Sequence, residues 1–225
     1  MKGLVIDTAL GSCSAVVFDG HTVLASQSEP MTKGHSERIG GFVRDAVAGS
    51  GLDFADLDRI AMTIGPGSFT GLRVGLAFAL GVGEAMDRPV SGISSLEALA
   101  ASADDRGGHV CAAIDARRGQ IYVQTFEDGR ALMSPQALSI EQAVGQLADG
   151  ADWRLIGSGA PLLIDDRPGR AIDPLAAPTV IGLVRCALAA DPQTHLPKPL
   201  YLRAPDATPP TRLPGQARPA RTAPA

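Results

Sequence analysis

Apolar runs and polar breaks alternate along residues 1–203 in a way that predicts a mixture of strands and helices. The chain opens with three strand-length apolar patterns, over residues 2–7, 13–18 and 22–29, which short polar turns separate. Residues 35–48 then carry apolar side chains at helical spacing. The opening therefore predicts a β-meander followed by an amphipathic helix. The apolar face of that helix holds Ile39, Phe42, Val43, Ala46 and Val47.

The central segment, residues 60–92, predicts a strand, a tight loop, a helix and another strand. Its first apolar run ends at Gly65-Pro66-Gly67, which is a strong turn signal. The hydroxyl of Ser68 or Thr70 can cap the helix that follows, which we expect over residues 72–86. We expect the rest of the chain to be organised around this segment.

The predicted central helix has no obvious solvated face, because no charged residue lies between Arg73 and Glu84. A glycine inside a helix costs about 1 kcal/mol relative to alanine, so several of them need a packing reason, usually the close approach of another backbone. Two explanations stay open: the helix is sandwiched inside one domain, or it packs on its own sheet and receives a partner's helix on its other side. The small residues form two stripes, Gly71, Gly75, Ala79 and Gly83, and Ala77, Gly81 and Ala85.

The opening pattern returns after a polar break at residues 104–108. A shift of the chain by 108 positions places Ile6-Asp7 on Ile114-Asp115 without a gap. Two strands separated by a polar turn recur there, with an aspartate at the end of the first strand. We interpret this recurrence as a duplicated fold core. The same shift also places Gly11 on Gly119, Phe18 on Phe126 and Asp19 on Glu127.

The break divides the chain into two predicted lobes of an α/β fold, residues 1–104 and residues 105–203. The second lobe is smaller and simpler. The last segment, residues 204–225, is rich in proline, alanine and arginine without periodicity, which predicts a disordered tail. Elements expected in the second half are a helix over 139–148, a strand over 154–157, a helix over 179–190 and an extended piece over 198–203.

Composition narrows the classes of partner. The formal net charge is −4 and aromatic residues make up 4% of the chain, so an extended basic surface with stacking aromatics for nucleic acid is not indicated. The three cysteines are scattered, which fits a reducing cytoplasm better than a disulfide framework. No signal peptide is recognisable, and we see no apolar run near the length of a membrane span. We therefore expect a cytoplasmic protein without a membrane anchor.

Candidate chemistry gathers at the glycine loop of residues 65–71 and at Asp7. Glycines before a helix can aim amides at a phosphate, but the loop is neither a Walker A sequence nor a dinucleotide fingerprint. Asp7 ends a strand, where a carboxylate can face a metal-phosphate or form an Asx turn, and we favour the Asx turn. Candidate phosphate contacts are Asp7, Gly65, Gly67 and Ser68.

Five segments of the chain resemble the bacterial TsaB (YeaZ) family: LVIDTALGSCSAVVFDG, IGPGSFTGLRVGLAFALGVG, ISSLEALA, IDARRGQIYV and PLYLR. The resemblance implies an actin-like (ASKHA, ribonuclease H-like) fold, built as a duplicated β-meander with helices. It also implies a role in making threonylcarbamoyladenosine beside the anticodon of tRNAs. In that family the catalytic subunit is the paralogous TsaD, and the ATPase TsaE joins the complex.

The resemblance implies an accessory subunit without catalytic residues. TsaD places two metal-binding histidines in an H-x-x-x-H motif, where this chain has Ser95 and Leu99, which are poor metal ligands. We expect a TsaD-type partner on the two N-terminal helices, a homodimer when the chain is alone, and tRNA only through the complex. Bulky residues at Gly75 and Gly83 should then block the complex and spare the fold. The expected partner-binding residues are His35, Ile39, Phe42, Val43, Gly71, Arg73, Gly75, Leu76, Ala79 and Gly83.

Two enzymatic alternatives stay open at the sequence level. An actin-like ATPase or small-molecule kinase would use Asp7 and the loop of residues 65–71, and a metallopeptidase would hold zinc or iron. On the favoured interpretation the chain binds no cofactor by itself, and ATP or ADP belongs to the assembled complex.

Overall fold

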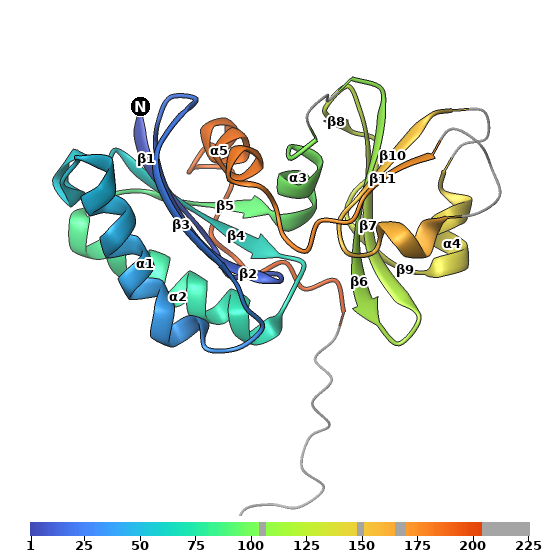
Figure 1. Cartoon of the computed structure of the whole chain (residues 1–225), viewed down its shortest axis with the longest axis horizontal. Helices are drawn as coiled ribbons and strands as arrows, with labels where there is room; N and C mark the ends of the chain where they lie inside the picture. The colour runs from blue at the N-terminus through green and yellow to red at the C-terminus, as the bar shows by residue number, and fades with distance from the viewer. Residues whose placement is uncertain (104–106, 148–150, 165–169, 204–225) are drawn as a thin grey trace, which may run out of the picture.

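The computed structural model describes residues 1–103, 107–147, 151–164 and 170–203. A mixed sheet forms the first lobe, from β1 (Lys2–Asp7), β2 (Ser12–Asp19), β3 (Thr22–Pro30), β4 (Arg59–Gly65) and β5 (Val90–Ser94). The strand order is β3-β2-β1-β4-β5, with β1 antiparallel to β2 and parallel to β4 (Figure 1). The three opening strands are the predicted meander.

Two long helices, α1 (His35–Ser50) and α2 (Phe69–Met86), cover one face of this sheet (Figure 1), and a short 3-10 helix, η1 (Phe54–Asp56), leads into β4. The apolar face predicted for α1 is buried in the core beneath it. α2 begins at Phe69, three residues before the expected start. The reason is its cap: the Ser68 hydroxyl accepts a hydrogen bond from the Gly71 amide at 3.2 Å.

The second sheet repeats the arrangement of the first. Its order is β11-β10-β6-β7-β8, which matches β5-β4-β1-β2-β3 strand for strand. The duplicated core and the actin-like fold class are therefore confirmed, although the sequence patterns did not indicate β8, β9 and β11. The elements are β6 (His109–Arg117), β7 (Gln120–Glu127), β8 (Arg130–Ala131), β9 (Gln136–Ser139), α4 (Ile140–Gly145), β10 (Trp153–Ile156), η2 (Ala160–Leu163) and β11 (Arg170–Asp173).

The gap-free repeat is wrong beyond its first strand. Asp7 lies opposite Ser14 in the first hairpin, but Asp115 lies opposite Ile121, one residue earlier than the shift of 108 requires. The second hairpin is thus one residue shorter at its turn, where Arg117 adopts a left-handed φ of 64°. Matches past the turn, such as Phe18 with Phe126, therefore fall at positions that are not equivalent.

Each lobe's last helix packs against the other lobe's sheet. α3 (Ser95–Ala100) follows β5, yet its Leu96 and Leu99 share a core with Ile114 of β6. α5 (Val180–Ala189) follows β11, yet its Leu183 shares a core with Val5 of β1. In Figure 1 both helices lie between the two sheets.

The predicted division at residue 104 therefore needs correction. After α5 the chain stays with the first lobe, because the Gly92 amide donates to the His195 carbonyl at 2.8 Å and the Leu200 amide donates to the Ile64 carbonyl at 2.7 Å. Residues 180–200 consequently belong to the first lobe in space, although the sequence pattern assigned them to the second. Arg203 returns to the second lobe, where its guanidinium donates to the Ala116 carbonyl at 3.2 Å. The predicted tail, residues 204–225, and the expected end of α4 at Ala148 lie outside the described residues.

Candidate functional site

The first stripe of small residues on α2 faces its own sheet. A Cβ atom built on Gly71 would overlap the Thr8 carbonyl oxygen, and one on Gly75 would overlap the Thr8 hydroxyl. A Cβ atom on Gly83 would overlap the Val90 side chain. The glycines therefore let the α2 backbone lie directly on β1, β4 and β5. This packing accounts for their cost to the helix.

Eight of the expected partner-binding residues are buried inside the lobe and cannot form its contact surface. The amphipathic face of α1 and the first stripe of α2 both point at the sheet. Bulky residues at Gly75 and Gly83 would disrupt the lobe itself, contrary to expectation. Arg73 is exposed and Leu76 partly exposed. The buried eight are His35, Ile39, Phe42, Val43, Gly71, Gly75, Ala79 and Gly83.

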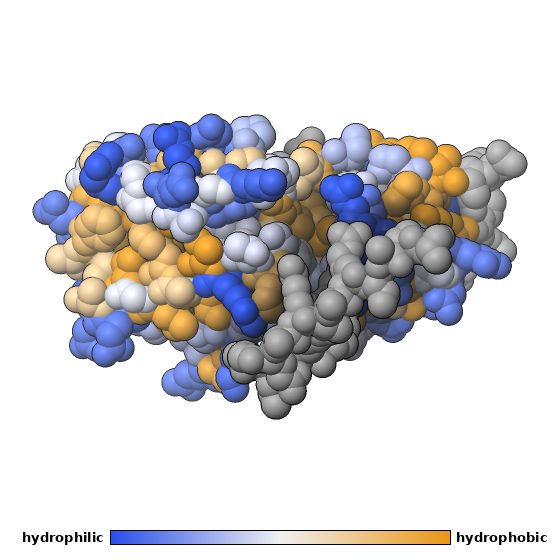
Figure 2. Space-filling model, turned by 90° about the horizontal axis from the view of Figure 1, so that it is seen from below, coloured by the Kyte–Doolittle hydropathy of each residue, from blue (hydrophilic) through white to orange (hydrophobic). Residues whose placement is uncertain are grey.

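The second stripe of α2 points outward. Ala77, Gly81 and Ala85 are exposed, and a Cβ atom on Gly81 would meet nothing within 4 Å. α1 continues this surface, since a Cβ atom on Gly40 would lie 3.7 Å from the Phe78 ring. Figure 2 shows the resulting apolar band across the first lobe. We call this surface the outer face; it comprises Gly40, Gly41, Val74, Ala77, Phe78, Gly81 and Ala85.

α2 is apolar on all sides, yet only 28% of it is buried. The explanation in which the helix is sandwiched inside one domain is therefore wrong. Among the described residues, α2 is the helix whose length and composition would allow it to cross a membrane, a feature that we did not recognise in the sequence. That is weak evidence for a membrane span, because a helix that packs on a core passes the same test, and α2 lies along its sheet.

Asp7 is fully buried at the end of β1. Its Oδ1 accepts hydrogen bonds from the Thr63 hydroxyl at 2.6 Å and from the Ala9 amide at 3.0 Å. The bond to Ala9 is the Asx turn that we favoured. Burial raises the pKa of the Asp7 carboxyl, although Thr63, Ala9 and the nearby His35 act in the opposite direction. Oδ2 has no hydrogen-bond partner among the described residues.

The glycine loop packs on the turn after β1, and several of its polar groups already form hydrogen bonds. The Ser68 amide donates to the Ala9 carbonyl at 2.7 Å, and the Gly71 amide donates to the Ser68 hydroxyl. The Thr8 hydroxyl donates to the Gly71 carbonyl at 2.8 Å. These bonds clamp the start of α2 to the end of β1, so two amides of the candidate phosphate loop are already used.

A cleft of about 420 Å³ lies between the lobes, beside this loop. Of the four candidate phosphate contacts, Gly67 and Ser68 line it, whereas Asp7 and Gly65 do not. The opposite wall holds Asp115, whose Oδ1 accepts from the Arg117 amide at 2.8 Å in another Asx turn. Three further polar residues line the cleft without any signal in the sequence, because segments far apart in the chain bring them together: Thr32, Tyr122 and Ser158.

The two positions at which the resemblance implied the paralogue's metal ligands belong to the core of this chain. Ser95 and Leu99 are both 0% exposed, and Leu99 packs against the second sheet. Within the described residues, no three His, Cys, Asp or Glu side chains gather as a metal site.

Cys186 is expected to be the first cysteine to react with a thiol reagent in the folded protein. Cys13 and Cys111 are buried, and burial raises the pKa of their thiols to about 11 and about 12. Cys186 is partly exposed. Titration with a chromogenic disulfide should show one fast thiol, which Cys186→Ser removes. A second thiol reacting at the same rate would contradict the described burial.

Comparisons place these features among known proteins. Residues 22–154 match the model of a family described as TsaD: tRNA N6-adenosine threonylcarbamoyltransferase. The tRNA threonylcarbamoyladenosine biosynthesis protein TsaB of Escherichia coli is 33% identical over 171 residues, which are 71% of this chain and 72% of that protein. YeaZ from Pseudomonas aeruginosa is similar with a TM-score of 0.75 and 29% identity, over 89% of this chain and 99% of that one. The activator of 2-hydroxyisocaproyl-CoA dehydratase from Clostridium difficile, solved with ADPNP, has a TM-score of 0.51 and 11% identity, over 84% of this chain and 94% of that one, and shows the fold alone.

Proposed function

The chain belongs to the TsaB (YeaZ) family of tRNA threonylcarbamoyladenosine biosynthesis proteins, and we propose that it is a non-catalytic subunit that binds a TsaD-type catalytic subunit through the outer face. The match to the TsaD family model shows that this chain is similar to such a subunit, and we propose that the two associate as a pair of like folds. The residues at positions 95 and 99 support an accessory role, because a buried serine and a buried leucine are poor metal ligands.

The outer face is the observation that carries the proposal. It combines exposed small residues with partly exposed Val74 and Phe78, so a partner's helix can approach the α2 backbone closely. Association would remove apolar surface from water at a gain of about 25 cal/mol per Å². A continuous apolar surface of this kind on a protein marks an interaction site.

Ala77→Glu is expected to weaken binding to the TsaD-type subunit by about tenfold or more, because it places an unpaired carboxylate in a desolvated interface. Ala77 is exposed, so the fold should be unchanged. Isothermal titration of the purified subunits measures the affinity. Ala171→Glu, the same change at an exposed position of β11 in the second lobe, is the matched control and should bind normally. Equal affinities for both variants would refute the outer face as the docking site.

In the absence of its partner we propose that the chain forms a homodimer through the same face. Light scattering of the wild type should then show a dimer, and Ala77→Glu a monomer. We further propose that a TsaE-type ATPase joins the complex in the cytoplasm. On this proposal tRNA binds to the complex mainly through the other subunits. The net charge of −4 supports binding of tRNA by other subunits, because tRNA is itself negatively charged.

The alternative of an ATPase or kinase requires Asp7 and the loop of residues 65–71 to face a nucleotide. The full burial of Asp7 and the engaged amides of Ser68 and Gly71 count against it. Calorimetry of the isolated chain with Mg-ATP is expected to show no binding heat. Micromolar binding that Asp7→Ala abolishes would favour the enzyme instead.

A further inference from the structure

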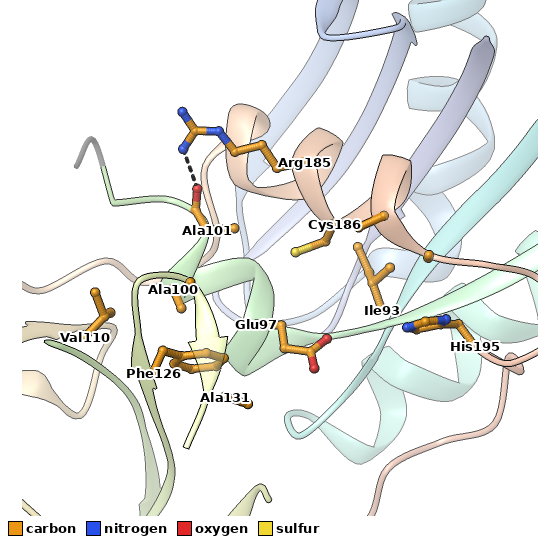
Figure 3. Close-up of a pocket in the computed structure, with 13 residues that line it drawn as sticks. Ile93, Glu97, Ala100, Ala101, Val110, Phe126, Ala131, Arg185, Cys186 and His195 are labelled. Carbon is orange, nitrogen blue, oxygen red and sulfur yellow. Dashed lines mark hydrogen bonds between the residues drawn. The ribbon is translucent and has the colours of Figure 1, made fainter. Parts of the chain in front are cut away.

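A pocket of about 270 Å³ lies where α3 and α5, the two helices that pack on the opposite lobe's sheet, meet β7 and β8 (Figure 3). We call it the junction pocket. It is separate from the interlobe cleft and from the outer face, with which it shares no residue. Side chains from both lobes line it, among them Ile93, Glu97, Val110, Phe126, Cys186 and His195.

The walls of the junction pocket are mainly apolar and belong to the packed core. Ile93 at the end of β5 is 1% exposed, and Val110 and Phe126 of the second sheet are 3% and 4% exposed. Because these side chains are fixed by the cores of both lobes, the cavity is preformed. Preformed apolar cavities with a few polar groups are the usual form of a small-molecule site.

Glu97 supplies the negative charge of the pocket. Its backbone amide donates to the Ser94 hydroxyl, the cap of α3, at 3.4 Å. Within the described residues its carboxylate makes no hydrogen bond and no ion pair. The side chain is only partly exposed, and in Figure 3 it extends into the pocket. A carboxylate that lines a pocket and makes no ion pair can accept a charge-assisted hydrogen bond from a ligand. A cationic ligand would supply the missing partner.

The other polar side chains do not compete for this role. The Arg185 guanidinium turns away from the pocket and donates to the carbonyls of Ala101 at 2.7 Å and Ala103 at 3.2 Å (Figure 3). His195 forms the wall opposite Glu97. Its Nδ1 accepts the Asp191 amide at 3.1 Å, so this nitrogen is already engaged. Glu97 is thus the acceptor that a ligand would meet.

We propose that the junction pocket binds a small organic amine, whose ammonium group pairs with Glu97 and whose apolar body packs against Phe126 and Ile93. Such a ligand would contact both lobes at once, since α3 packs on the second sheet and α5 on the first. The proposal does not depend on the docking of a TsaD-type subunit.

Three probes of equal size test the proposal on the full chain: benzylamine, benzyl alcohol and benzoate. Nuclear magnetic resonance titration is expected to show benzylamine shifting the signals of Ile93, Glu97 and Phe126, with benzoate at least tenfold weaker. Benzylamine should also slow the labelling of Cys186, which lines the pocket. Benzoate binding as tightly as benzylamine would overturn the proposal, and so would the absence of pocket shifts at millimolar benzylamine.

Glu97→Gln keeps the shape of the side chain and removes its charge. It should weaken benzylamine by about tenfold, the expected value of a charge-assisted hydrogen bond, and leave benzyl alcohol unchanged. Glu141→Gln is the matched control, since Glu141 also lies in the first turn of a short helix but is exposed and outside the pocket. An unchanged benzylamine affinity in Glu97→Gln would assign the binding to the apolar walls alone and refute the role of the carboxylate.

Discussion

Gly71→Ala is expected to lower the free energy of unfolding by about 3 kcal/mol or more. The added methyl group would overlap the Thr8 carbonyl oxygen, which is backbone and cannot rotate away. α2 would have to lift from β1, and the hydrogen bond from the Thr8 hydroxyl to the Gly71 carbonyl would be lost with that contact. Denaturant unfolding followed by circular dichroism measures the change.

Gly81→Ala is the control in the same helix, and its expected change in the free energy of unfolding has the opposite sign. Nothing lies within 4 Å of the new methyl group, and alanine favours the helix by about 0.5–1 kcal/mol over glycine. The variant should therefore be more stable than the wild type. If both variants destabilised the protein equally, the assignment of an inward and an outward stripe would be wrong.

Asp7→Asn is expected to gain stability relative to the wild type as the pH rises from 3.8 through the raised pKa of the Asp7 carboxyl. Burial raises the pKa of the Asp7 carboxyl above its ordinary value of 3.8, so the folded state holds the proton more tightly than the unfolded chain. The stability that this proton supplies is complete below pH 3.8 and is lost as the pH rises through the raised pKa. Asparagine has no charge to bury and keeps the oxygen that accepts from Thr63 and Ala9.

Unfolding free energies of both proteins across this pH range test the expectation. Asp115→Asn is the matched control, because Asp115 forms the same kind of Asx turn but is partly exposed. Comparing the two variants separates the effect of burial at Asp7 from the loss of a charged Asx turn. A wild type whose stability tracks that of Asp7→Asn at every pH would show that Asp7 is not held in a desolvated site.

The local patterns of the chain determined its elements and its family. Alternating apolar runs located β1, β2 and β3, the hydroxyl of Ser68 predicted the cap of α2, and helical spacing identified the buried face of α1. These signals can be recognised in a single sequence because each depends only on residues that are close together in the chain. The duplicated core could also be recognised, since both meanders repeat the same order of strand and turn.

Only the tertiary structure decided which side of each element faces the core. Periodicity groups Gly71 with Gly75 and Ala77 with Gly81, but it does not say which group meets the sheet, because both are small and apolar. The burial of Asp7 depends on Thr63, 56 residues away, and the junction pocket depends on helices that cross to the opposite lobe. Such contacts arise when distant segments close around a shared core. The sequence therefore supplied both stripes of α2, and the packed fold decided which one is exposed.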